Sequence, residues 1–509
     1  MSAASHADYD VVVVGSGLGG LSAGALLAHA GARTLVVEQA DRPGGYGASF
    51  TRGDYRFDAA VHVTLEAAPG RLTANLLDYL GVGERCTMVA IGDPYAVAMP
   101  DLQLQLPNGL DAYVEAHARL FPREADALRR YFEMRTQLFI QMARMPQQVG
   151  VAELGEAMRV APLVFRHRSA TVQEVLDQYF TDDRLKALLS VAWPYVGSPP
   201  SRLSFLLYSQ VMELLVTDAR YALGSFETLV EALVEALESS GGRLVVAQAV
   251  TRIKVADGAV TGVVLADGSE VSARVVISNA DALHTFKDLL GEDLLPRRYR
   301  KRLERAKPSH SAVVLYTAFR GDAADIGLPH ETFVYRHWDH DQTEADLVAG
   351  RPGGVWISVP TGLDSSLAPP GVQLVTISAL APYEVTGGWS ERLPAYPEEL
   401  LELVGAGVPA LAGTLEVVAT ATPETLEHRT RNSAGAIYGW DNTPNQVASK
   451  RLGHRTPIDG LLLSGHWAAE GSSSFRVLLS GIETARMVAD DLGTQPIPEL
   501  RGANITALH

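Results

Sequence analysis

Three glycines near the amino terminus, Gly15, Gly17 and Gly20, have the spacing of a phosphate-binding turn. Gly15 would allow a sharp turn, Gly17 would let a pyrophosphate approach the bare backbone, and Gly20 would let a helix pack closely on a strand. Free N–H groups at the start of that helix favour anionic oxygen atoms. The turn therefore predicts a dinucleotide site, formed by Gly15, Ser16, Gly17, Leu18, Gly19 and Gly20.

A carboxylate follows at the spacing that a nucleotide ribose requires. Glu38 comes about twenty residues after the turn, and Gln39 stands beside it. The Glu38 carboxylate can accept hydrogen bonds from both hydroxyls of an adenosine ribose. Its negative charge disfavours a 2′-phosphate, so NADP is expected to fit poorly.

The flanking sequence must form a strand, a turn and a helix to position these groups. Residues 9–14 are an apolar run typical of a strand buried on both faces, and residues 21–28 are typical of a helix. Residues 33–37 predict a second strand that ends at Glu38. A glycine-rich loop alone is common, and the plain alternative is a tight turn between strand and helix. The strand, the helix and Glu38 together favour dinucleotide binding.

A glycine pair, Gly44 and Gly45, follows Arg42 and Pro43. Such a pair lets a loop lie against a bound ligand, as it does in flavoproteins with this arrangement. NAD dehydrogenases usually continue directly into further strand–helix units. The pair therefore favours a flavin dinucleotide.

The chain resembles the phytoene desaturase family of FAD-dependent enzymes, which includes carotenoid isomerases and retinol saturases. The resemblance rests on the amino-terminal turn, the Pro43–Gly45 loop, Phe57–Asp58, and two later blocks, residues 224–281 and 456–481. It implies FAD as the cofactor. It also implies an α/β fold, in which a three-layer Rossmann-type FAD domain of the glutathione reductase kind carries an inserted α+β substrate domain.

The resemblance extends the expected FAD site into these later blocks. Val250 is expected to lie beside the adenine, which its backbone groups would read. Related flavoproteins often place an acidic residue after the glycine that ends the last strand, and here His466 follows Gly465. Ser474 directly precedes the final predicted helix, residues 475–492, whose free N–H groups are suited to negative charge on a reduced flavin.

A chain of 509 residues is long enough for two domains. The changes of pattern predict an FAD domain in three segments, 1–85, 222–295 and 441–509. The substrate domain is expected in two segments, 86–221 and 296–440. Residues 193–208 are aromatic and apolar, and they are read either as part of a substrate tunnel or as a packed helix.

Histidine is the residue type that most readily exchanges a proton near neutral pH. His62 and His466 each follow a segment that the family folds against the flavin, so they are the candidate catalytic residues. A lone histidine is more often a packed or surface residue. No metal-ligand spacing, nucleophile elbow or Walker-type phosphate loop is present.

The net charge of −16 argues against a nucleic-acid partner. No apolar run reaches the roughly 18 residues of a membrane span, so a cytoplasmic protein is expected. The excess of arginine over lysine indicates a bacterial gene of high GC content. Residues 296–307 are the one dense basic run, read either as a solvated helix or as a patch for anionic lipid and peripheral membrane contact.

The resemblance implies an FAD enzyme that dehydrogenates carbon–carbon bonds of a long apolar substrate, either a polyene or another isoprenoid or lipid-like molecule. In such a reaction hydride moves to the flavin and a proton leaves the adjacent carbon. A redox-neutral double-bond isomerase and a saturase are the nearest alternatives. An amine oxidase and a non-enzymatic escort protein of the Rab GDP dissociation inhibitor type rank behind them.

Overall fold

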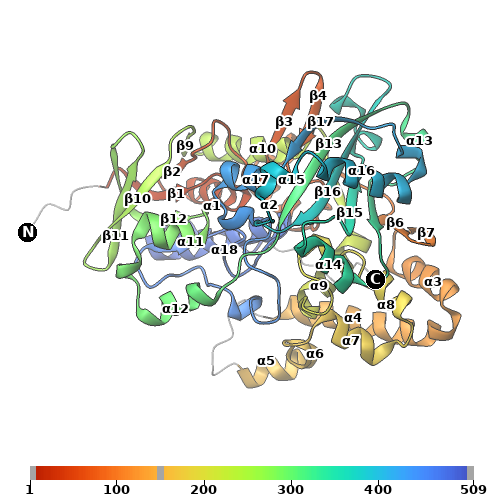
Figure 1. Cartoon of the computed structure of the whole chain (residues 1–509). Coiled ribbons are helices and arrows are strands. Elements are labelled where there is room, and N and C mark those ends of the chain that lie inside the picture. The colour runs from red at the N-terminus through yellow and green to blue at the C-terminus, as the bar shows by residue number, and fades with distance from the viewer. Residues whose placement is uncertain (1–6, 146–153, 501–509) are drawn as a thin grey trace, which may run out of the picture.

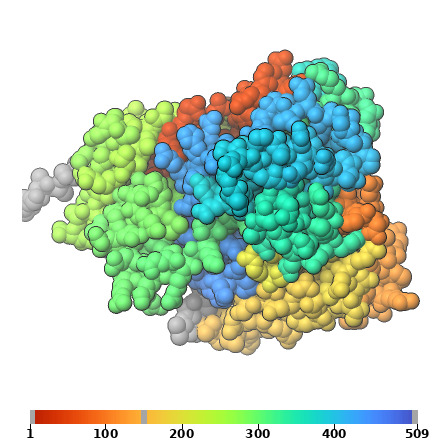
Figure 2. Space-filling view, in the orientation of Figure 1, coloured from red at the N-terminus to blue at the C-terminus, as the bar shows by residue number. Residues whose placement is uncertain are grey.

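The computed structural model describes residues 7–145 and 154–500 (Figure 1). Two seven-stranded sheets organise this part of the chain. Segments far apart in sequence share one surface: in Figure 2 the blue carboxyl-terminal segment lies between the green region near β12 and the yellow helical region.

The first sheet has a parallel part and an antiparallel part. Its five parallel strands are β9 (Arg243–Val245), β2 (Thr34–Val37), β1 (Tyr9–Val14), β12 (Glu270–Ser278) and β18 (Leu461–Leu463). The amino-terminal half of β12 continues into an antiparallel meander with β10 (Val250–Ala256) and β11 (Ala259–Leu265). The parallel strands end at one edge, where the glycine turn begins.

Three layers result because β1 is apolar on both faces. Val11 and Val13 pack against α1 (Leu18–His29), α10 (Glu227–Ser239) and α18 (Ser474–Leu492). Val12 and Val14 pack on the opposite face against residues of the meander. The predicted three-layer FAD fold is confirmed.

The second sheet is mostly antiparallel, and one of its sides faces the first sheet. Its strands, in spatial order, are β17 (Glu416–Ala421), β13 (Ser311–Arg320), β16 (Val372–Ala381), β15 (Gly354–Ser358), β14 (Glu331–Tyr335), β6 (Tyr95–Met99) and β7 (Leu102–Leu106). Val313 and Leu315 of β13 point to a core that includes α16 (Tyr396–Gly407). Ala312, Val314 and Tyr316 alternate with them and point to the other side.

Helices between β7 and β8 (Arg220–Ala222) cover the end of this sheet, at the bottom right of Figure 1. They are α3 (Leu110–Leu120), α4 (Ala125–Arg144), α5 (Leu154–Val160), α6 (Pro162–His167), α7 (Val172–Tyr179), α8 (Asp183–Leu189) and α9 (Phe205–Thr217). Thr171 and Glu174 form a capping box at the start of α7. Trp193 is 1% exposed and α9 is buried along most of its length, as the packed-helix reading predicts.

Shorter elements complete the fold. They are β3 (Ser49–Arg52), β4 (Tyr55–Asp58), α2 (Leu72–Tyr79), β5 (Met88–Ala90), α11 (Ala282–His284), α12 (Arg297–Arg305), α13 (Ala323–Ile326), α14 (His340–Val348), α15 (Gly388–Arg392) and α17 (Pro423–Thr430). Within residues 7–145 and 154–500, none of the helices combines the length and apolar character needed to cross a bilayer.

The strands of the first sheet come from residues 9–37, 243–278 and 461–463, and those of the second from 95–106 and 311–421. The chain therefore passes more than once between the two sheets. The domain boundaries given above remain predictions.

Candidate flavin site

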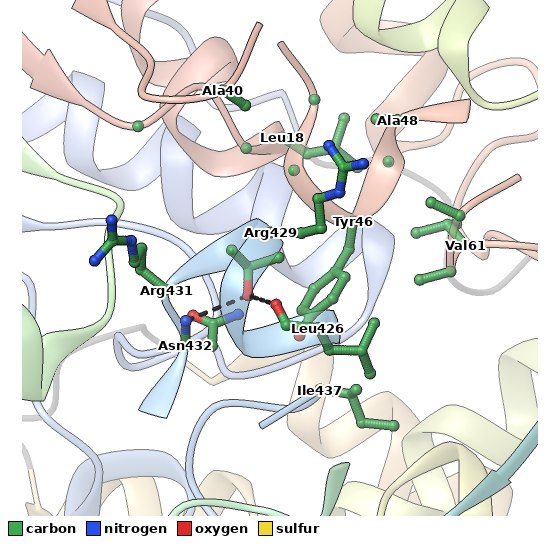
Figure 3. A pocket seen from close by; sticks show the side chains of 18 of the residues that line it. Leu18, Ala40, Tyr46, Ala48, Val61, Leu426, Arg429, Arg431, Asn432 and Ile437 are labelled. Atoms are coloured by element: carbon green, nitrogen blue, oxygen red, sulfur yellow. Dashed lines mark hydrogen bonds between the residues drawn. The ribbon is translucent and has the colours of Figure 1, made fainter. Parts of the chain in front are cut away.

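A cavity of about 510 Å³ lies between the two sheets, and both contribute to its walls. Figure 3 shows Leu18, Ala40 and Ala48 on the nucleotide side, facing Leu426, Asn432 and Ile437. The side chain of Tyr46 reaches from the first group toward the second, and its hydroxyl donates to Ala436 O at 3.2 Å. The cavity is thus lined by segments from both halves of the chain.

The glycine turn forms one end of this cavity. α1 begins at Leu18, directly after Gly17, so its free N–H groups face the cavity. A Cβ atom on Gly17 would lie 2.8 Å from Asn279 Nδ2, which shows how closely the turn is surrounded. A Cβ on Gly20 would lie 2.2 Å from Gly15 O, so helix and strand can meet here only without a side chain.

Glu38 is 8% exposed and lies at the cavity wall beside Gln39. Its Oε2 accepts from Ser16 N at 2.8 Å and Ser16 Oγ at 2.6 Å, and its Oε1 accepts from Ala40 N at 2.8 Å. A carboxylate has about four acceptor positions, so it keeps capacity for a ribose hydroxyl. Ser16 and Gly20 do not line the cavity themselves; Ser16 acts by holding Glu38.

The Gly44–Gly45 pair folds back on the turn. Gly44 N donates to Ser16 O at 3.0 Å, and its φ of 114° lies in the left-handed region that favours glycine. Both glycines line the cavity, as do Val250, Gly465 and Ser474. Ser474 Oγ donates to Thr64 Oγ1 at 2.8 Å, which ties the start of α18 to the loop after His62.

His466 lies in the cavity wall, with Nε2 3.3 Å from Asn432 Oδ1. Burial, followed by the charge of Arg451, lowers the pKa of His466 to about 3. The imidazole is therefore neutral at pH 7 and only weakly basic, which disfavours it as a proton acceptor.

His62 also lines the cavity, next to Trp356. Its Nδ1 is 3.0 Å from Glu331 Oε1, and its Nε2 accepts from Trp356 Nε1 at 3.0 Å. Burial opposes its charge, but the carboxylate of Glu331 outweighs burial and raises the pKa of His62. Of the two candidate histidines, His62 is the stronger base.

The structure adds wall residues that the sequence reasoning did not assign: Asn279, Tyr316, Trp356, Asn432 and Tyr438. Asn279 directly follows β12, so its position at the carboxyl end of a parallel strand was a usable signal. Tyr316 and Trp356 lie on strands of the second sheet, and Asn432 and Tyr438 lie between α17 and β18; no spacing in the sequence marked any of them.

Dinucleotide binding therefore rests on three features: a helix start facing the cavity, glycines where a Cβ would collide, and a carboxylate with free acceptor capacity. These residues fit FAD, and the fold and site define an FAD-dependent oxidoreductase. The family described as flavin containing amine oxidoreductase matches residues 18–489. The chain belongs to this family.

Known relatives resemble the chain along most of its length. A neurosporene-forming phytoene desaturase from Rhodobacter capsulatus is 28% identical, covering 97% of this chain and 95% of that protein. Prolycopene isomerase 1 from an Oncidium hybrid is 28% identical, with 96% and 85% covered. All-trans-retinol 13,14-reductase from Danio rerio is 25% identical, with 90% and 82% covered. The predicted resemblance to the phytoene desaturase family is confirmed.

A solved structure, an oxidoreductase from Methanosarcina mazei, has the same fold. The TM-score is 0.64 at 18% identity, and the match covers 93% of this chain and 99% of that one.

Proposed function

We propose that the protein dehydrogenates a carbon–carbon bond of a long apolar polyene or isoprenoid. The observation that carries this proposal is the apolar and aromatic character of the cavity wall that residues 312–438 supply. The apolar and aromatic residues of this wall are Ala312, Val314, Tyr316, Trp356, Ala419, Ala421, Leu426, Ile437 and Tyr438; the polar ones are Ser378, Thr420, Thr425, Arg429, Thr430, Arg431 and Asn432. FAD supplies the hydride acceptor when bound, while this wall orients an apolar chain and excludes water.

The same wall argues against an amine substrate. Among the described residues that line the cavity, the carboxylates are Glu38 and Asp41, and both lie on the nucleotide side. An ammonium group placed beside Tyr316 or Trp356 would find no carboxylate among the described residues that line this part of the cavity, so its desolvation would be costly. Phytoene desaturase, prolycopene isomerase and retinol reductase in the names of the relatives agree with an apolar polyene class.

One anaerobic experiment tests the proposal and separates its alternatives. The purified holoprotein is mixed with phytoene, prolycopene or all-trans-retinol in phosphatidylcholine liposomes, and the flavin absorbance and products are followed. A desaturase bleaches its flavin stoichiometrically with a new double bond. An isomerase changes double-bond geometry without net flavin reduction, and a saturase acts only after the flavin has been reduced. Reduction by primary amines but by none of the polyenes would overturn the proposal.

We further infer a cytoplasmic protein that contacts anionic membrane through α12. Arg297, Arg298, Lys301 and Arg305 are exposed on this helix, whereas Leu303 is buried against the protein. Arg302 is engaged otherwise, because it donates to the carbonyl of Lys450 at 2.8 Å. An apolar substrate concentrates in membrane, and a basic helix face is attracted to anionic lipid by roughly 1 kcal/mol per residue near the surface.

A further inference from the structure

The carboxylate of Glu331 lies where an apolar side chain would be expected. Glu331 is the first residue of β14 and pairs with Ser358 of β15, and the next residues on the same face are Phe333 and Trp356. The Glu331 side chain is 0% exposed. A buried carboxylate is costly unless hydrogen bonds compensate for the lost water.

Three side chains supply these hydrogen bonds, those of His62, Tyr195 and Ser358. Oε1 lies 3.0 Å from His62 Nδ1, and His330 Nε2 is 3.2 Å from the same oxygen without a hydrogen bond to it. Oε2 accepts from the hydroxyl groups of Tyr195 and Ser358, the latter at 3.1 Å. None of these described partners is a lysine or an arginine, so the only groups that can neutralise the carboxylate are the two imidazoles.

Trp356 fixes the tautomer of His62. An indole N–H can donate but cannot accept, and Trp356 Nε1 lies 3.0 Å from His62 Nε2. Nε2 must therefore carry the lone pair, and the ring proton lies on Nδ1, where it is donated to Glu331. His330 Nε2 adds a 2.7 Å contact to His62 O, which holds the backbone of the same residue.

The His62 residue lies in the cavity wall. Trp356 also lines the cavity, and Val61, the residue before His62, is labelled at the right of Figure 3, across the view from Arg431. Glu331 lies behind His62 and does not line the cavity. In this arrangement the Glu331 carboxylate orients the His62 imidazole and stabilises its charged form.

We propose that Glu331 is the positioning residue that makes His62 the proton acceptor of the dehydrogenation. The inference rests on the proposed function. A C–H bond of the substrate breaks and its proton passes to His62 Nε2, while bound FAD would accept the hydride that leaves the neighbouring carbon. The electron pair left on the first carbon forms the new double bond. For this transfer Trp356 must withdraw its N–H from Nε2, so proton uptake displaces one indole in the cavity wall.

The electrostatics of the neighbouring groups agree with this role. Burial opposes charge on both partners, yet Glu331 and then Asp58 raise the pKa of His62, and His62 and then His330 lower the pKa of Glu331. The hydroxyl of Tyr195 stays protonated, because burial, followed by the charge of Glu331, raises its pKa.

The first test needs neither substrate nor variant of Glu331. The ring nitrogens of the oxidised holoprotein are observed by ¹⁵N NMR after histidine labelling, and the His62 signals are assigned by their loss in His62→Gln. We expect the neutral form to carry its proton on Nδ1. A neutral form protonated on Nε2 would overturn the proposal, whatever the substrate proves to be.

The second test compares Glu331→Gln with Ser358→Ala, which removes a donor to the same carboxylate but leaves its charge. Glu331→Gln should lower the pKa of His62 by about 1 unit or more, and should move the acidic limb of the flavin-reduction pH profile down by the same amount. Glu331→Asp should recover part of both, and Ser358→Ala should change little. An unchanged His62 pKa and an unchanged limb in folded Glu331→Gln would leave Glu331 a purely structural residue.

The proposed function can be wrong while the positioning role of Glu331 is right. If the NMR results are as expected but no polyene reduces the flavin, the substrate class is wrong and the positioning of His62 stands.

Discussion

The two sides of the cavity present different chemical groups: one side presents mainly backbone, and the other presents mainly side chains. The nucleotide side is largely backbone, with Gly15, Gly17 and Gly44 around a helix start, and Glu38 as its one carboxylate held by hydrogen bonds. The opposite side consists of side chains on strands, such as Val314, Tyr316 and Trp356. Backbone recognition tolerates almost no added atoms, whereas a wall of side chains can be altered one group at a time.

The largest expected effect is on the nucleotide side. Gly17→Val should give colourless protein, because the new Cβ would lie 2.8 Å from Asn279 Nδ2 and the side chain would occupy the path of the pyrophosphate. The measurement is the flavin released on denaturation, which should be FAD in the wild type. Gly453→Val is the control, since no atom lies within 4 Å of a Cβ at that position. Full FAD occupancy in Gly17→Val would show that the turn does not bind the cofactor.

On the substrate side, His62→Ala should keep FAD bound but slow anaerobic flavin reduction by about 10²-fold or more, as expected for loss of a general base. His466→Ala should have the smaller effect, because burial and the charge of Arg451 lower the pKa of His466 to about 3. Stopped-flow reduction by a polyene in liposomes measures both. Unchanged rates in the two variants would remove these histidines from the mechanism and leave orientation by the apolar wall.

Glu38→Gln sharpens the comparison within the nucleotide side. A hydrogen bond to a charged group contributes about 1.5–3 kcal/mol, so losing the ribose contact should weaken FAD binding by about 10- to 100-fold. Isothermal titration of apoprotein with FAD gives the dissociation constant. Asp41→Asn is the matched control, because Asp41 also lines the cavity but is exposed. Equal losses in both variants would point to general charge rather than to a ribose contact.

The smallest effect is expected far from either wall. Arg298→Gln on α12 should weaken binding to phosphatidylserine-containing vesicles about fivefold at moderate salt, which corresponds to roughly 1 kcal/mol for one basic residue. Arg130→Gln on α4 removes an equally exposed arginine elsewhere. Identical vesicle affinity for Arg298→Gln and the wild type would leave α12 as a solvated helix.

The contrast between the backbone side and the side-chain side of the cavity also explains what the sequence could predict. The turn, Glu38 and the glycine pair are recognisable because backbone geometry restricts residue type at fixed spacing. Helices such as α4 and α10 follow from apolar periodicity. The sequence could not predict which residues of β13 line the cavity. Val313 and Val314 are equally apolar, and only the pairing of the strands decides which one faces the cavity.

Glu331 illustrates a second limit. Nothing local distinguishes it from a surface glutamate, since its partners are His62, Tyr195 and Ser358, which lie between 27 and 269 residues away. The role of a buried carboxylate can be recognised only when the fold shows which distant donors bind it.

The contact between α1 and the residues that follow β18 joins segments made at very different times during synthesis. Ser464 Oγ donates to Gly19 O at 3.2 Å across 445 residues of sequence, and Ser22 Oγ donates to Leu478 O at 3.2 Å. At about 5–20 residues per second, the ribosome delivers Ser464 roughly 20–90 s after Gly19. The wall that Gly465 and Ser474 contribute can therefore form only near the end of translation.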